Sequence, residues 1–147
     1  MATRSLIGIV NPQSGTITTI YNHFDGYPQG VGVQLALNYG EKETKRLIKL
    51  GNRRSLGGKP SKKDTFSGEY EYPVIHFSFA QLEEYVTRTD VRYVYIGQQV
   101  AGYGFAWTAY SVEYGPEHDI AKGIIDKSLK RLGIVRPEVK FEATHAA

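Results

Sequence analysis

Two β-rich runs near the start of the chain, 4-RSLIGIV-10 and 16-TITTIY-21, decide the fold. Five residues separate them, and among these Pro12 and Gly15 are residue types that set turn dihedrals. Closely spaced β-rich runs with turn residues between them predict a β-hairpin. Residues 92–96 and 105–112 form a second such pair around Gly102 and Gly104, and they predict a second hairpin.

The segments outside the hairpins predict mostly helix. Apolar spacing, proline and glycine favour helices over 28–40, 41–50, 79–87 and 118–132. The last helix is amphipathic, and it either caps the sheet, which we favour, or binds a partner. Residues 51–68 are expected to form a mobile loop. Pro73 interrupts a strand-like run over 70–77, which is therefore expected to be either an edge strand or irregular.

Strands and helices do not alternate along the chain, so a doubly wound parallel sheet is disfavoured. The pattern instead predicts an α+β domain, with an antiparallel sheet built from two or more β-hairpins and helices packed on one face. A single domain is expected over residues 1–133. The tail over 134–147 contains Pro137 and is expected to be loosely ordered.

Composition excludes several classes of protein. The 147 residues include no cysteine, which excludes disulfides, thiolate zinc sites, iron–sulfur clusters and a cysteine nucleophile. The opening MATRSLIGIV is too short for a signal-peptide core or a membrane span. We therefore expect a cytoplasmic protein with no membrane association.

Positive charge is concentrated in residues 42–63, which carry nine cations against Glu43 alone. The chain as a whole has a net charge of +3, so the remaining residues sum to −5. Such a segment suits phosphate, nucleotide or nucleic acid, although a solvated helix face and a Lys-rich loop would look the same. No aromatic residue interleaves the cations before Phe66, whereas single-strand binders need aromatic platforms for the bases.

The segment 25-DGYPQGVG-32 is the densest in unusual residues. Its three glycines permit positive φ or a close backbone approach. If Pro28 begins a helix, free N–H groups there would favour an anion. Asp25 is then either a helix cap, the commoner use, or a site carboxylate. The segment lacks the third glycine of a dinucleotide fingerprint and the Gly-Lys-Ser/Thr of a P-loop.

His23 precedes Asp25 by two residues, a spacing that suits a general base or a metal ligand. A packing or exposed histidine is the commoner case, and no second histidine lies nearby at a ligand spacing. We therefore predict no metal, no cofactor and no catalytic residue. On the second hairpin, Trp107 and Tyr110 should lie on opposite strand faces, one set filling the core and the other exposed. An exposed set would suit stacking of a base or docking of a partner, whereas core and half-buried surface is the explanation that we favour.

The opening 3-TRS-5 and the motif from Tyr21 through 25-DGYPxGxG-32 resemble a family of small phage and prophage proteins. Members often begin Met-Gly-Thr-Arg-Ser, carry Trp-Asp-Gly-Tyr-Pro and commonly end in a Tyr-rich strand pair. The likeness covers about the first 35 residues, and more loosely residues 93–110. Ala2 replaces the glycine, Phe24 replaces the tryptophan, and neither the Lys-rich stretch after Arg54 nor the expected C-terminal helix matches. The resemblance implies a viral accessory protein and brings no settled activity.

Three functions from different classes follow. The first is a phage accessory protein for host takeover or counter-defence, which acts in the host cytoplasm without catalysis. It would bind a nucleotide-like anion or a host protein, as a homo-oligomer whose neighbour completes the pocket. The expected ligand-binding residues are Arg4, His23, Asp25, Gly26, Tyr27, Gly30, Gly32, Arg53 and Arg54. The alternatives are a nucleic-acid binder that uses residues 42–63 and a phosphoester-processing enzyme built on His23 and Asp25.

Overall fold

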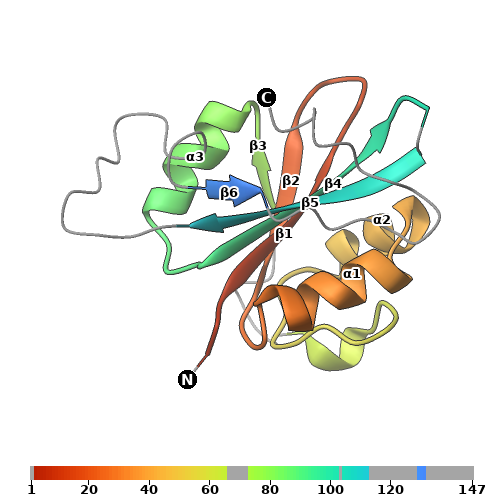
Figure 1. Ribbon diagram of the computed structural model, residues 1–147, viewed down its shortest axis with the longest axis vertical. Helices are drawn as coiled ribbons and strands as arrows, with labels where there is room; N and C mark the ends of the chain where they lie inside the picture. Colours follow the sequence, from red (N-terminus) through yellow and green to blue (C-terminus); the bar gives the residue numbers. More distant parts are fainter. Residues whose placement is uncertain (1, 66–72, 103, 113–128, 132–147) are drawn as a thin grey trace.

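The computed structural model describes residues 2–65, 73–102, 104–112 and 129–131. Within these residues a six-stranded sheet has the strand order β3-β2-β1-β4-β5-β6 (Figure 1). The strands are β1 (Ser5–Val10), β2 (Ile17–Asn22), β3 (Val74–His76), β4 (Tyr93–Val100), β5 (Gly104–Val112) and β6 (Leu129–Arg131). The helical elements are η1 (Pro28–Gly32), α1 (Val33–Asn38), α2 (Glu41–Leu50), η2 (Lys62–Asp64) and α3 (Phe79–Thr87).

Both expected hairpins are present. β1 pairs antiparallel with β2 from Ser5 opposite Asn22 to Val10 opposite Ile17. The Asn11 side chain fixes the turn, because its Oδ1 accepts a hydrogen bond of 2.9 Å from the Gln13 N–H. β4 and β5 form the second antiparallel pair. The α+β class and its hairpins are therefore confirmed.

The two hairpins meet along a parallel pair, β1 with β4, so the sheet is mixed rather than wholly antiparallel. Between β2 and β4 the chain runs through the helices and β3, and it enters β4 in the same direction as β1. Edge strand β3 pairs with β2 only over Ile17 to Thr19, which is the edge-strand alternative expected after Pro73.

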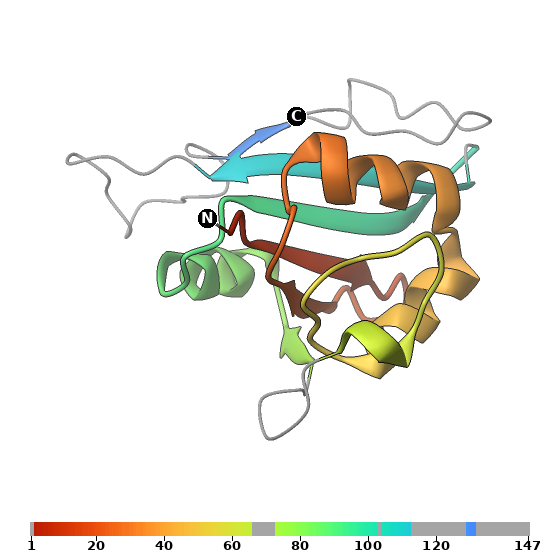
Figure 2. The ribbon, with the colours of Figure 1, turned by 90° about the horizontal axis from the view of Figure 1, so that it is seen from below.

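The helices cover both faces of the sheet, so the expectation of helices on one face is wrong. Ile7 and Tyr95 belong to one core, with Leu35 of α1 and Leu47 of α2. On the other face Leu6 and Val94 pack with Leu82 and Val86 of α3. Successive residues of β1 and β4 are apolar, and each face of such a strand needs cover. Figure 1 shows α1 and α2 apart from α3, and Figure 2 shows α1 across β4 and β5.

Trp107 and Tyr110 lie on opposite faces of β5, as expected. Trp107 is buried in the core under α1 and α2. Tyr110 packs against the core under α3, and Tyr93 packs against the first core. Both cores recruit these rings, which agrees with the favoured explanation of core and half-buried surface, and Tyr93 and Tyr110 do not form an exposed set.

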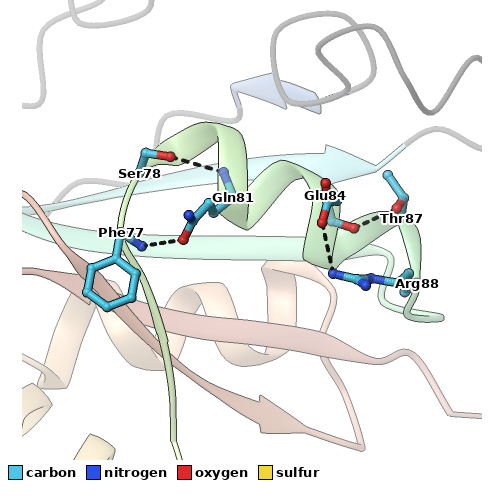
Figure 3. A network of polar contacts seen from close by, with 6 residues as sticks. All are labelled: Phe77, Ser78, Gln81, Glu84, Thr87 and Arg88. Carbon is cyan, nitrogen blue, oxygen red and sulfur yellow. Dashed lines mark hydrogen bonds and ion pairs between the residues drawn. The ribbon is translucent and has the colours of Figure 1, made fainter.

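Local side-chain bonds define both ends of α3 (Figure 3). At the start, Ser78 Oγ accepts from the Gln81 N–H, and Gln81 Oε1 accepts from the Phe77 N–H. This reciprocal arrangement satisfies N–H groups that have no partner inside the helix. Near the end, Glu84 forms an ion pair of 3.1 Å with Arg88, four residues later.

Residues 129–131 form β6, antiparallel to β5 with Arg131 opposite Tyr110. The helix expected over 118–132 is therefore wrong at these three residues, where the open edge of β5 offers backbone partners. The remainder of that prediction lies outside the described residues. The tail over 134–147 lies outside them as well.

Candidate functional site: the Asp25 bend and its pocket

The chain leaves β2 through a tight bend at Asp25, whose φ is +57°. Among the described residues it is the one non-glycine residue with positive φ, a region that Asp adopts more readily than most residues. The carbonyl oxygen of Asp25 accepts from the Val31 N–H at 2.9 Å, which closes the bend. A backbone conformation of this kind costs free energy, and the surrounding structure must hold it.

Two glycines make the bend sterically possible. A Cβ on Gly26 would lie 2.6 Å from the Thr3 carbonyl oxygen and 2.8 Å from the Ser5 side chain. A Cβ on Gly30 would overlap the carbonyl oxygen of Asp25. Gly26 is buried beside the start of β1, where Tyr95 donates a hydrogen bond of 2.6 Å to its carbonyl oxygen.

The expectation that this bend offers free amides to an anion is wrong at three of its N–H groups. Gly26 donates to Thr3 O at 2.8 Å, Gly30 donates to Tyr27 O at 2.9 Å, and Val31 donates to Asp25 O. These three N–H groups already have acceptors within the chain, so they do not bind a ligand. Negative charge on a ligand therefore needs side-chain cations elsewhere.

Asp25 does not cap the helical turn that Pro28 begins. The residue at the N-cap position is Tyr27, and no side chain makes a capping bond there. The exposed Asp25 carboxylate instead accepts a hydrogen bond of 3.1 Å from the Tyr27 hydroxyl. This bond raises the pKa of Tyr27.

A pocket of about 200 Å³ opens beside the Asp25 carboxylate. Its polar lining comes from Asp25, Tyr27, Gln29 and Gln34, together with the glycine backbone at Gly30. Val31, Val33 and Leu56 supply the apolar walls. The lining therefore combines a carboxylate, a phenol and two carboxamides with aliphatic groups, and it contains no cation.

Arg53 does not frame this pocket, because its side chain is fully buried. Its guanidinium donates to the carbonyl oxygens of Ser61 at 2.9 Å and Ser55 at 3.5 Å. Its backbone bridges Asn22 and Thr65. Burial lowers the pKa of Arg53. Arg53 thus fastens the loop that presents Leu56. Residues 51–65 form a loop, as expected, with one short 3₁₀ turn over Lys62–Asp64.

Arg4 and His23 belong to a different cluster, around Tyr21. The Tyr21 hydroxyl is 2.7 Å from His23 Nδ1, and the His23 ring packs edge-on against Phe24. Burial raises the pKa of Tyr21, and the Arg4 guanidinium hydrogen-bonded to it opposes that shift. Neither Arg4 nor His23 lines the Asp25 pocket.

The structure therefore divides the nine expected site residues. Asp25, Tyr27 and Gly30 line the pocket, and Gly26 and Gly32 are buried beside it. The exposed Arg54 is next to the bend, because its carbonyl oxygen accepts from the Phe24 N–H at 2.7 Å. Sequence reasoning missed five lining residues: Gln29, Val31, Val33, Gln34 and Leu56. The available sequence signal for all of them except Leu56 was their place on the helical turns that begin at Pro28. Leu56 reaches the pocket only through the burial of Arg53.

Comparison with known proteins finds no matching family model, no matching curated protein and no matching solved structure. In the described parts of the chain, no group of three or more His, Asp or Glu gathers where a metal ion would bind. No helix there is long and apolar enough to cross a membrane. Function is therefore argued from the geometry of this site and from the motif likeness.

Proposed function

We propose that this chain is a phage accessory protein that acts in the host cytoplasm by binding a nucleotide-like ligand at the Asp25 pocket. The observation that carries the proposal is Asp25 itself. A carboxylate on a left-handed residue, braced by two packed glycines, stands at the rim of a pocket. Strained residues of this kind concentrate at ligand sites.

The lining supports a nucleobase as the part of the ligand that enters. A carboxylate and two carboxamides match the N–H and carbonyl groups along the edge of a base. The Tyr27 ring is 38% exposed, so a flat ring can lie against it.

The phosphate of such a ligand requires a cation outside the pocket. Arg54 supports this role, since it is exposed and its backbone is bonded to Phe24, next to Asp25. A second copy of the chain is the other source of a cation, because the pocket is small, at about 200 Å³, and its own lining supplies none. The motif shared with small phage proteins supports the viral setting.

Isothermal titration calorimetry with GMP, AMP, CMP and UMP tests the proposal. We expect at least one of the four to bind the full chain, and Asp25→Asn to weaken that binding at least tenfold. Asparagine tolerates the left-handed backbone, so this variant removes the charge while the bend is kept. The exposed Asp90 supplies the matched control, and Asp90→Asn should bind as the wild type does.

Failure of all four nucleotides to bind would refute the nucleotide proposal, as would an Asp25→Asn variant with unchanged affinity. Native mass spectrometry of the protein purified from host lysate adds a second readout. We expect a nucleotide-sized mass that is released on denaturation. The same spectra report whether the ligand is held by one copy of the chain or by an oligomer.

A further inference from the structure

Helix α2 separates its apolar and cationic residues onto opposite faces. Thr44, Leu47 and Ile48 are buried against the sheet. The exposed side carries four cations at helical spacings: Lys42, Lys45, Arg46 and Lys49. Residues three and four apart lie on the same side of a helix, so these cations form one stripe about 10 Å long at 1.5 Å per residue.

The acidic side chains of α2 do not neutralise this stripe evenly. Glu43 Oε1 accepts from the Gly40 N–H at 3.1 Å and so caps the helix start. Glu41 binds Lys45 at 3.1 Å and also accepts from Gln99 at 2.8 Å. Among the described residues, no ion pair involves Lys42, Arg46 or Lys49.

Polar groups that suit phosphate lie next to the stripe. Lys45 and its ion-pair partner Glu41 line a groove of about 510 Å³ with Gln13, Thr16 and Thr18 of the first hairpin. The rest of the lining is Asn11 and the apolar residues Ile9, Val10, Pro12 and Ile75. Hydroxyl and carboxamide groups contact phosphate oxygens in nucleic-acid complexes, beside the lysines and arginines that supply most of the affinity. The groove thus extends a phosphate-binding surface sideways from α2.

We propose that this face of α2 binds the phosphate backbone of double-stranded nucleic acid without reading its sequence. The stripe holds cations and no aromatic residue, so it offers no platform on which single-stranded bases could stack. The apolar side of α2 packs in the core, so the helix has no apolar face left to insert into a lipid surface. This inference stands apart from the Asp25 pocket, because the two surfaces share no residue.

Fluorescence anisotropy with a labelled 20-base-pair DNA duplex, titrated at several salt concentrations, tests the inference on the full chain. We expect the logarithm of the binding constant to fall linearly with the logarithm of salt. The triple variant Lys42→Gln, Arg46→Gln and Lys49→Gln should weaken binding at least tenfold at low salt. Its salt slope should fall by about 2.7, since each phosphate contact contributes about 0.9.

A matched variant controls for total charge. Lys59→Gln, Lys62→Gln and Lys63→Gln remove the same three charges from the exposed loop, and we expect less than a threefold loss of affinity. A second duplex of unrelated sequence should bind equally. Glutamine suits a helix surface, so circular dichroism should show both variants folded.

Three results would overturn the inference: no duplex binding at 50 mM salt, equal losses in the two triple variants, or tighter binding to vesicles of anionic lipid than to the duplex. Nucleotide titrations at the Asp25 pocket should be unaffected by the α2 variant. The duplex titration therefore tests the α2 proposal and the nucleotide titration tests the Asp25 proposal, so one proposal can fail without affecting the result for the other.

Discussion

The hydroxyl of Tyr95 donates a hydrogen bond of 2.6 Å to the carbonyl oxygen of Gly26, a residue 69 positions earlier in the chain. The contact joins β4 to the Asp25 bend inside the core. It holds the first residue after the strained position against the sheet. Formation of the pocket therefore depends on a residue that does not line it.

Replacement of Tyr95 by phenylalanine should loosen the bend. The Gly26 carbonyl would stay buried without its donor, which costs about 1–3 kcal/mol of unfolding free energy. Urea denaturation measures that loss, and nucleotide affinity should fall together with it. Tyr93→Phe is the matched control, because Tyr93 stacks on Tyr95 but is only partly buried. Equal stability losses in the two variants would contradict the role given to the Tyr95 hydroxyl.

Gly26→Ala should destabilise the protein through direct overlap with the Thr3 backbone and the Ser5 side chain. Overpacking of this kind costs about 1–3 kcal/mol. Gly57→Ala is the control, because a Cβ there meets nothing within 4 Å. We expect the control to stay within about 0.5 kcal/mol of the wild type in thermal or urea unfolding. If Gly26→Ala left the free energy of unfolding unchanged, the bend would have space for a Cβ and the role given to Gly26 would be contradicted.

Arg53→Ala should open the loop that carries Leu56. The Ser61 and Ser55 carbonyl oxygens would lose a charged donor. A hydrogen bond from a charged group contributes about 1.5–3 kcal/mol to the free energy of unfolding, so we expect a loss of that order. Arg54→Ala changes an exposed neighbour of the same type and should alter stability by less than about 0.5 kcal/mol. Limited proteolysis should cut the Arg53 variant between residues 54 and 61. Similar protease resistance in both variants would argue against the fastening role.

His76 should make the unfolding free energy depend on pH. Its ring lies in the second core, with Nε2 2.9 Å from Thr19 Oγ1 and Tyr85 packed against it. Burial lowers the folded-state pKa of His76 below 6.5. As pH falls below the unfolded-state value, only the unfolded chain gains the proton, so stability falls by up to about 1.4 kcal/mol per pH unit.

Urea unfolding at pH 7.5 and pH 5.5 checks this dependence, with His76→Gln as the non-titrating comparison. The wild type should lose more stability than the variant on acidification. Equal losses of stability in the wild type and in His76→Gln would show that a group other than His76 causes the pH dependence.

The hairpins and α2 were predictable because their signals are local. Turn residues between β-rich runs fix the hairpins, and the spacing of Leu47 and Ile48 fixes the buried side of α2. The parallel pairing of β1 with β4 was not predictable in the same way. It joins Ser5 to Tyr93 across most of the chain, and nothing in either strand specifies its neighbour.

The site shows the same division. Asp25, Tyr27 and Gly30 were found from the glycine-rich motif, and they do line one pocket. Arg53 and Arg54 are adjacent and alike in the sequence, yet one is buried and the other is exposed. Alternate residues of an extended segment face opposite ways, and only the tertiary contact of Arg53 with Asn22 decides which of the two is buried.

The most direct test of the central claim is a set of ¹H–¹⁵N NMR titrations of the labelled full chain with GMP, AMP, CMP and UMP. A base held beside Asp25 predicts that at least one of the four causes amide shifts concentrated at residues 25–34 and at Leu56, which should disappear in Asp25→Asn. Shifts confined to other surfaces, or spectra unchanged at millimolar concentrations of all four nucleotides, would contradict a nucleotide site at this bend.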